Sequence, residues 1–158
     1  MKRVNAIVHH PGFADRLKRL ESLEAERIFC RHDFTHLLDV ARMMWIAVLE
    51  QQIPVDREIV YAAALLHDIG RADQLERGIP HDQAGAELAA QILPEAGFTP
   101  GETREIVRAI LAHRTDGSTE ILGQLLYRAD KACRACWRCG AKCECNWPEE
   151  KKNTDITR

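Results

Sequence analysis

The pair His67-Asp68 closes an apolar stretch that runs from Tyr61 to Leu66, and Ile69-Gly70 follow it directly. Such a stretch favours a helix, and Gly70 is predicted to end that helix as its C′ residue. An imidazole and a carboxylate at the buried end of an apolar helix cost desolvation free energy unless a partner offsets it. A divalent cation is such a partner, so the sequence predicts a metal site here.

Two other stretches carry groups that could complete this site. His32 and His36 lie one turn apart in a predicted long helix, residues 32–51, and His36 lies near its apolar face. Asp130 adjoins the apolar stripe of another predicted helix, where an unpaired carboxylate is unusual. Each residue alone has an ordinary explanation, since a core histidine is usually hydrogen-bonded and Asp130 can pair with a neighbouring cation. Nitrogen and oxygen ligands together suit Mn, Fe, Co, Ni or Zn better than calcium.

The remaining segments predict helices and no strands. Apolar residues recur at helical spacing over residues 13–27, 57–67, 82–93, 99–113 and 120–132. Asp56 resembles the N-cap of the second of these, and Pro94 is expected to end the third. The polar segment 71–78 is predicted to be a loop or short turn. We therefore expect an all-α protein.

Composition limits the class of protein. The chain has 158 residues, which suggests one domain, and its net charge is −2 from 22 basic and 24 acidic residues. This balance gives no electrostatic reason to expect a nucleic-acid partner. No apolar run is long enough for a membrane span, and no signal peptide is evident. We expect a cytoplasmic protein, in which cysteines serve as thiols or metal ligands rather than disulfides.

The segments RHDFTHLLDVARMM, LLHDIGR, PHDQAGAELAAQIL, IVRAILAHR and LLYRADKACR together resemble the HD-domain superfamily of metal-dependent phosphohydrolases. The resemblance covers roughly residues 13–135. It implies a compact bundle of about six to seven helices within a domain of residues 1–135. It also implies that the metal ligands are His36, His67, Asp68 and Asp130.

Some members of this superfamily carry two further histidines, and His81 and His113 match their places. The resemblance then implies a second ion with Asp68 as the bridging ligand, and a site with one ion is the alternative. The implied reaction is attack of metal-bound hydroxide on a phosphate ester, with cations stabilising the phosphoryl oxygens. The further candidates for catalytic or supporting roles are Arg71, Lys131, Asp73, Arg114 and His32.

Five cysteines fall within CRACWRCGAKCEC, residues 133–145. The spacing of Cys133, Cys136, Cys139 and Cys143 is ferredoxin-like, although Glu144 stands where that motif has proline. The same thiols could instead bind zinc or remain free. In a resembling subgroup of small bacterial HD proteins, the matching positions are Cys136, Cys139, Cys145 and Trp147. Cys30 is expected to be a separate, buried apolar residue. Residues 136–158 are predicted to form a cysteine-rich extension with a charged tail.

Three functions remain open at this point. The first is an enzyme that acts on a small phosphorylated substrate, for example a nucleotide, and that acts alone or as a homo-oligomer. The second is an HD module that senses a nucleotide or a metal without turnover. The third is a metal- or redox-responsive protein centred on the cysteines. The complete set of His and Asp ligands favours the enzyme.

Overall fold

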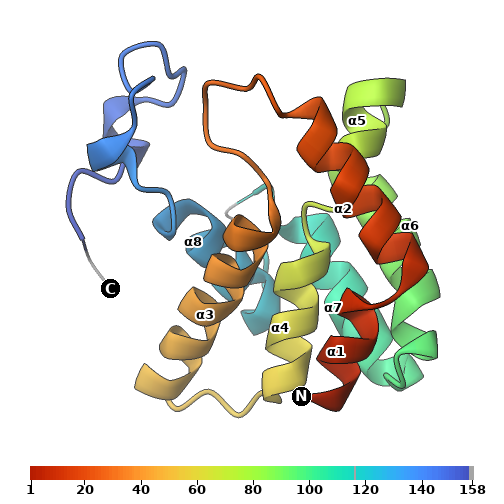
Figure 1. Ribbon diagram of the computed structural model, residues 1–158. Coiled ribbons are helices and arrows are strands. Elements are labelled where there is room, and N and C mark those ends of the chain that lie inside the picture. Colours follow the sequence, from red (N-terminus) through yellow and green to blue (C-terminus); the bar gives the residue numbers. More distant parts are fainter. Residues whose placement is uncertain (116, 157–158) are drawn as a thin grey trace.

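The computed structural model describes residues 1–115 and 117–156, so Asp116, Thr157 and Arg158 lie outside the description. In this part of the chain there are α-helices and two short 3₁₀ helices, and no strand (Figure 1). The α-helices are α1 (Lys2–Val8), α2 (Pro11–Leu23), α3 (Phe34–Glu50), α4 (Arg57–Leu66), α5 (Arg71–Arg77), α6 (His81–Glu95), α7 (Pro100–Ala112) and α8 (Ile121–Ala132). The all-α prediction is confirmed. Within the described residues no helix is long and apolar enough to cross a membrane.

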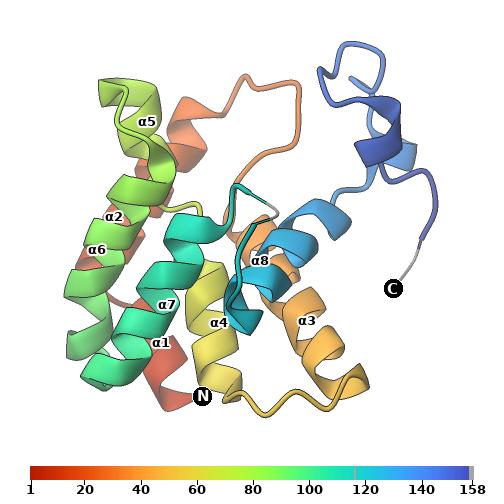
Figure 2. The same cartoon turned by 180° about the vertical axis from the view of Figure 1, so that it is seen from behind.

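Helix α4 lies at the centre of the bundle because nearly its whole surface is apolar. Seven of its residues are buried: Ile59, Val60, Ala62, Ala63, Ala64, Leu65 and Leu66. It contacts α1, α3, α6, α7 and α8. Figure 1 shows α3 and α8 on one side of α4 and α1 and α7 on the other, and Figure 2 shows the same arrangement from behind. The pair His67-Asp68, which follows α4, therefore lies inside the bundle.

Side-chain caps fix several helix starts. Asp56 caps α4 as predicted, by accepting a hydrogen bond from the backbone N–H of Glu58 at 2.8 Å. Asp33 caps α3 by accepting from the backbone N–H of His36 at 3.0 Å, which sets the turn that carries this imidazole. Helix α6 continues one residue past Pro94, where the sequence predicted an end. A proline near a helix end removes a single backbone donor, so the last turn tolerates it.

The segment predicted to be a loop, residues 71–78, forms helix α5 and ends at Gly78, whose φ is +71°. The helix escaped prediction because it has seven residues and almost no apolar face: its buried residues are Ala72 and Asp73. Arg16 on α2 donates a hydrogen bond to the carboxylate of Asp73 at 2.5 Å. This ion pair attaches α5 to the bundle.

Gly70 is required for a different reason from the predicted one. Its φ is −74°, so it is not a left-handed C′ residue, and it serves instead as the N-cap of α5. A Cβ atom at this position would lie 2.2 Å from the carbonyl oxygen of His81 and 2.4 Å from the backbone nitrogen of Gly85. The glycine therefore allows the turn after His67-Asp68 to touch the first turns of α6.

Candidate metal centre

Asp68 is the residue around which the site is arranged. Its side chain is completely buried, and its two oxygens face two different sets of imidazoles. Two groups of potential ligands result, and within each group the ligand atoms lie within 4.8 Å of one another. Both groups include Asp68. This is the geometry of a carboxylate that can bridge two cations.

The first group consists of His36, His67, Asp68 and Asp130. The Oδ2 atom of Asp68 lies 3.1 Å from Nε2 of His67 and 3.6 Å from Nε2 of His36. The Oδ1 atom of Asp130 lies 3.3 Å from Nε2 of His36 and 3.8 Å from Nε2 of His67. The four residues come from α3, the end of α4 and α8, so the packing of three helices brings them together.

The second group consists of Asp68, His81 and His113. The Oδ1 atom of Asp68 lies 3.5 Å from Nε2 of His81 and 3.7 Å from Nε2 of His113. The two Nε2 atoms lie 3.1 Å apart. His81 begins α6 and His113 caps the end of α7, as the sequence predicted. Two helix ends therefore meet at one oxygen of Asp68.

The protein alone leaves some of these buried atoms unsatisfied. Nε2 of His67 and Oδ2 of Asp68 have no hydrogen-bond partner among the described residues, although both are inaccessible to solvent. Buried polar atoms of this kind are costly without a partner. A divalent ion in the first group would be ligated by both atoms. The donor set of imidazole nitrogens and carboxylate oxygens thus fits a divalent transition metal.

The outer nitrogens of the imidazoles are held by acceptors. Nδ1 of His67 lies 2.7 Å from the carbonyl oxygen of Ala64, and Nδ1 of His113 lies 2.5 Å from that of Ile110. An Nδ1–H that donates to a carbonyl leaves the lone pair of Nε2 free and aims it inward. The ring of each histidine is therefore oriented for ligation by its own helix. Nδ1 of His81 is held at 2.5 Å by the side-chain oxygen of Gln74.

The charge states suit a cation as well. Burial alone would raise the pKa of Asp68, but His67 and Arg71 outweigh it and hold that pKa well below its ordinary value. Burial lowers the pKa of His81 to about 3, which keeps this imidazole neutral. Burial also opposes protonation of His67, yet the carboxylates of Asp68 and Asp130 outweigh it and raise its pKa to about 9. A cation bound beside these carboxylates would take over the role of that proton.

A cavity of about 1000 Å³ opens beside the first group, and Asp130 and His32 form part of its wall. The cavity is strongly basic, although the net charge of the whole chain is −2. Asp130 is the acidic residue among the described lining residues. The cations that line the cavity are Arg27, Arg71, Arg114, Arg128, Lys131, Arg134, Lys142, Lys151 and Lys152. The cavity therefore suits an anionic ligand.

Three of the predicted supporting cations line this cavity. Arg71 donates from Nε to Oδ1 of Asp68 at 2.7 Å, and Lys131 donates from Nζ to Oδ2 of Asp130 at 2.5 Å. Arg114 is half exposed and pairs with Asp82. Asp73, in contrast, does not line the cavity, and its ion pairs with Arg16 and Arg77 give it a role in packing.

Two buried residues support the site: Glu24, which escaped the sequence analysis, and Arg134, one of the cations predicted to pair with Asp130. Glu24 accepts from the backbone N–H of His32 at 2.8 Å, and its other oxygen lies 2.7 Å from Nδ1 of that ring. Nε2 of His32 then faces Asp68 at 3.9 Å. Arg134 donates to Oδ1 of Asp130 at 3.2 Å, and its Nη2 lies 3.0 Å from Nε2 of His36. The i,i+4 spacing of Asp130 and Arg134 was a signal, whereas Glu24 had none.

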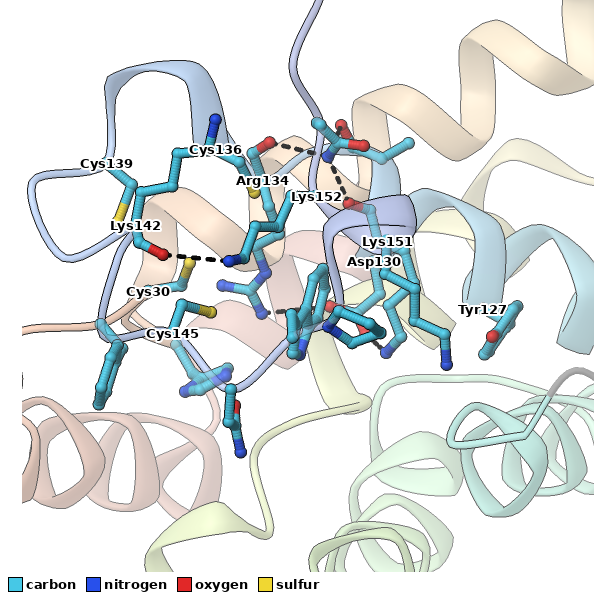
Figure 3. Close-up of a pocket in the computed structure, with 18 of the residues that line it drawn as sticks. Cys30, Tyr127, Asp130, Arg134, Cys136, Cys139, Lys142, Cys145, Lys151 and Lys152 are labelled. Atoms are coloured by element: carbon cyan, nitrogen blue, oxygen red, sulfur yellow. Dashed lines mark hydrogen bonds and ion pairs between the residues drawn. The ribbon is translucent and has the colours of Figure 1, made fainter.

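The C-terminal extension, here residues 136–156, forms the far wall of the cavity. Figure 3 shows Cys139, Lys142 and Cys145 at the end of the cavity away from Tyr127, whereas Lys151 lies beside Asp130. Its last part is fastened to α8, because the side-chain amide of Asn153 donates to the carbonyl oxygens of Lys131 and Arg134, both at 2.8 Å. The prediction that Cys30 is a separate, buried apolar residue is wrong. Cys30 is half-buried and lines the same cavity as the cysteines of the extension.

Comparison with known proteins agrees with this geometry. The chain matches the HD domain family over residues 33–135. It is 41% identical, over 99% of both chains, to a protein of Clostridium beijerinckii described as uncharacterised. It is 31% identical over 89% of its length to the ribonuclease Y of Desulforudis audaxviator, but spans 25% of that relative. The crystal structure of a predicted HD superfamily hydrolase from an uncultured Thermotogales bacterium superposes with a TM-score of 0.65, at 26% identity, over 96% of this chain and 87% of the other.

The histidines and aspartates that define the resemblance are the residues that the fold gathers around Asp68, and the family match spans them from His36 to Asp130. The protein is a member of the HD-domain superfamily.

Proposed function

We propose that the protein is a metal-dependent phosphohydrolase that cleaves a phosphate ester of a small molecule. The observation that carries this proposal is the position of Asp68: its two oxygens face two ligand groups, and the first of these groups adjoins a large basic cavity. Divalent ions bound there would lower the pKa of water and polarise a phosphoryl oxygen. The neighbouring hydrolase structure supports the same reaction class.

The residues of the chain supply binding and orientation. Arg71 and Lys131 lie at the border between the ligand groups and the cavity, where their charges would hold the phosphoryl oxygens and stabilise charge that develops on them. His32 presents Nε2 on the same side, and Glu24 fixes its ring through Nδ1. Burial lowers the pKa of His32 to about 4, so its neutral Nε2 would accept a hydrogen bond from water or substrate.

The aromatic side chains that line the cavity favour a substrate with a planar group. Nζ of Lys131 lies 5.4 Å from the centre of the Tyr127 ring and 6.0 Å from that of Trp147. Phe29 lines another part of the wall. A nucleotide combines a planar base with phosphate groups, so we propose nucleotides as the first substrates to test.

The test is hydrolysis by metal-replete protein of nucleoside mono-, di- and triphosphates, sugar phosphates and a short oligoribonucleotide, followed by phosphate release and by chromatography of the cleavage products. Asp68→Asn, whose amide cannot bridge two cations as a carboxylate does, is the matched control. Turnover of one compound by the wild type, with loss in the variant, is the expected result. Tight retention of a compound without any turnover would favour a sensor instead. Turnover confined to the oligoribonucleotide would contradict the small-molecule assignment.

A further inference from the structure

The six cysteines divide into two sets by their surroundings. Four of them, Cys30, Cys136, Cys139 and Cys145, line the large cavity. Figure 3 shows these four side chains gathered at one end of the cavity, with Cys30 reaching it from the loop before α3. Cys133 instead lies 3.4 Å from Nδ1 of His36 and lines a second, small cavity, and Cys143 is exposed. The ferredoxin-like spacing would require both residues of the second set.

Three of the four cavity thiols are close enough to interact electrostatically. Burial raises the pKa of the Cys30 thiol, Arg134 opposes this rise, and the thiols of Cys139 and Cys136 raise the pKa further. Thiols on one cavity wall become metal ligands only when their protons are removed and the resulting charge is neutralised. A cation bound between them would do both.

Two protein cations already lie beside this set. Arg134 reaches toward Cys30, and its Nη1 donates to the carbonyl oxygen of Arg31 at 3.2 Å. Lys152 donates from Nζ to the carbonyl oxygen of Lys142 at 3.1 Å, within the loop that joins Cys139 to Cys145. Four thiolates around a divalent ion carry a net charge of −2, and these two cations would offset it.

We propose that Cys30, Cys136, Cys139 and Cys145 bind one structural zinc ion that joins the C-terminal extension to the loop before α3. Four thiolates in tetrahedral arrangement are a typical closed zinc site, in which no position is left for a substrate. Each thiol releases its proton to solvent when the ion binds. Cys30 supplies the fourth ligand in place of Cys143, which is exposed and does not line the cavity.

Binding requires the loop of residues 139–145 to tighten. The groups of ligand atoms within 4.8 Å of one another in the described residues are those around Asp68, and the cysteine sulfurs are spaced more widely. The loop consists of turns, and Gly140 within it is exposed with open space around its Cα. Neither helix packing nor a bulky neighbour at Gly140 resists this movement.

The proposed ion would also hold two residues of the HD centre. Cys30 lies two residues before His32, and Cys136 lies two residues after Arg134. Arg134 contacts His36 and Asp130, and its guanidinium bonds back to the loop that carries Cys30. Zinc at the cysteines would therefore set the position of one wall of the cavity without touching the substrate.

Cobalt reports this site separately from the His–Asp centre, because sulfur-to-cobalt charge-transfer absorption requires thiolate ligands. The full-length wild type, Cys30→Ser, Cys133→Ser and Cys143→Ser would be reconstituted with Co²⁺ without oxygen. We expect the band in the wild type and in the Cys133 and Cys143 variants. We expect the charge-transfer band of the Cys30 variant to be weaker and its affinity for Co²⁺ to fall by more than about 100-fold. This loss exceeds the effect of mutating a residue that only hydrogen-bonds to a ligand. An unchanged band in Cys30→Ser, or no band in the wild type, would overturn the proposal.

A second measurement uses the wild type alone and does not depend on how a variant folds. Zinc-loaded protein is alkylated, and mass spectrometry follows each cysteine before and after a chelator is added. We expect the chelator to expose the four cavity cysteines together, while exposed Cys143 reacts at once in both samples. Alkylation of Cys30 that does not respond to the chelator would overturn its role. Release of the four thiols by a reductant rather than a chelator would show disulfides instead.

Discussion

The His–Asp centre and the cysteine-lined end of the cavity differ in what holds their ligands. In the first, ligands project from α3, α6 and α8 and from the ends of α4 and α7, and hydrogen bonds orient the imidazoles before any ion binds. In the second, one thiol lies in a short 3₁₀ helix and three lie in irregular segments, with wider spacing. The comparison suggests that helix packing prepares the first site for chemistry, whereas the proposed zinc would itself organise the second.

The change with the largest expected effect is Asp68→Asn. It weakens both ligand groups at once, because each oxygen of Asp68 faces one of them. We expect loss of the ions at this centre and a fall in turnover of more than about 100-fold. This fall exceeds the effect of mutating a residue that only hydrogen-bonds to a metal ligand. Elemental analysis should still find zinc at the cysteines. A variant that kept two ions at the His–Asp centre would refute the bridging role.

The variants His81→Ala and His113→Ala determine whether the His–Asp centre binds one ion or two. Both residues belong to the second group alone, so each variant should lose one ion and keep the ion held by His36, His67 and Asp130. Metal content per chain, after the zinc at the cysteines is subtracted, decides between one and two ions at the His–Asp centre. One such ion in the wild type, with content unchanged in both variants, would establish a mononuclear centre.

Gly70→Ala tests how tightly the turn after Asp68 packs against α6. The new Cβ would meet backbone atoms of His81 and Gly85 at 2.2 and 2.4 Å, and backbone cannot rotate away. We expect the free energy of unfolding to fall by about 1–3 kcal/mol, as for other overpacked sites. Gly140→Ala in the extension is the matched control, and should change it by less than about 0.5 kcal/mol. Urea titration measures the free energy of unfolding of both variants. Equal losses would show that the turn at Gly70 is no more tightly packed than the extension.

Glu24→Gln probes the outer support of the centre. The carboxylate accepts from both the backbone and Nδ1 of His32, and an amide has one acceptor oxygen for the two. We expect kcat to fall by roughly 10-fold with a smaller change in KM, because the ring of His32 loses its orientation. Glu26→Gln, at an exposed position, serves as the control. A change in KM alone would instead assign Glu24 to substrate binding.

The smallest expected effect follows from Asn153→Ala. Its amide nitrogen lies within hydrogen-bonding distance of the carbonyl oxygens of Lys131, Ala132 and Arg134 at the end of α8. Losing these bonds should cost about 1 kcal/mol, expressed as faster hydrogen exchange in the extension alone. If exchange also rose in α4, the extension would be part of the cooperative core.

The fold was largely accessible from the sequence because it rests on local patterns, whereas the full set of candidate ligands was implied by the resemblance to the HD-domain superfamily. Helical spacing of apolar residues revealed the long helices, and the His–Asp pair stood out as polar groups at an apolar helix end. Short α1 and α5 were missed, since seven residues carry too little periodicity. The positions of Glu24 and Cys30 were also missed. Each depends on contacts between segments far apart in the chain, and no local pattern encodes them.

The contact between Gly70 and α6 has a mechanical consequence for the centre. Asp68 lies two residues before this glycine, and His81 opens the helix that the glycine touches. Because backbone meets backbone there, no side chain acts as a compressible spacer between the aspartate and that histidine. The spacing between Asp68 and His81 is thereby set by peptide geometry itself.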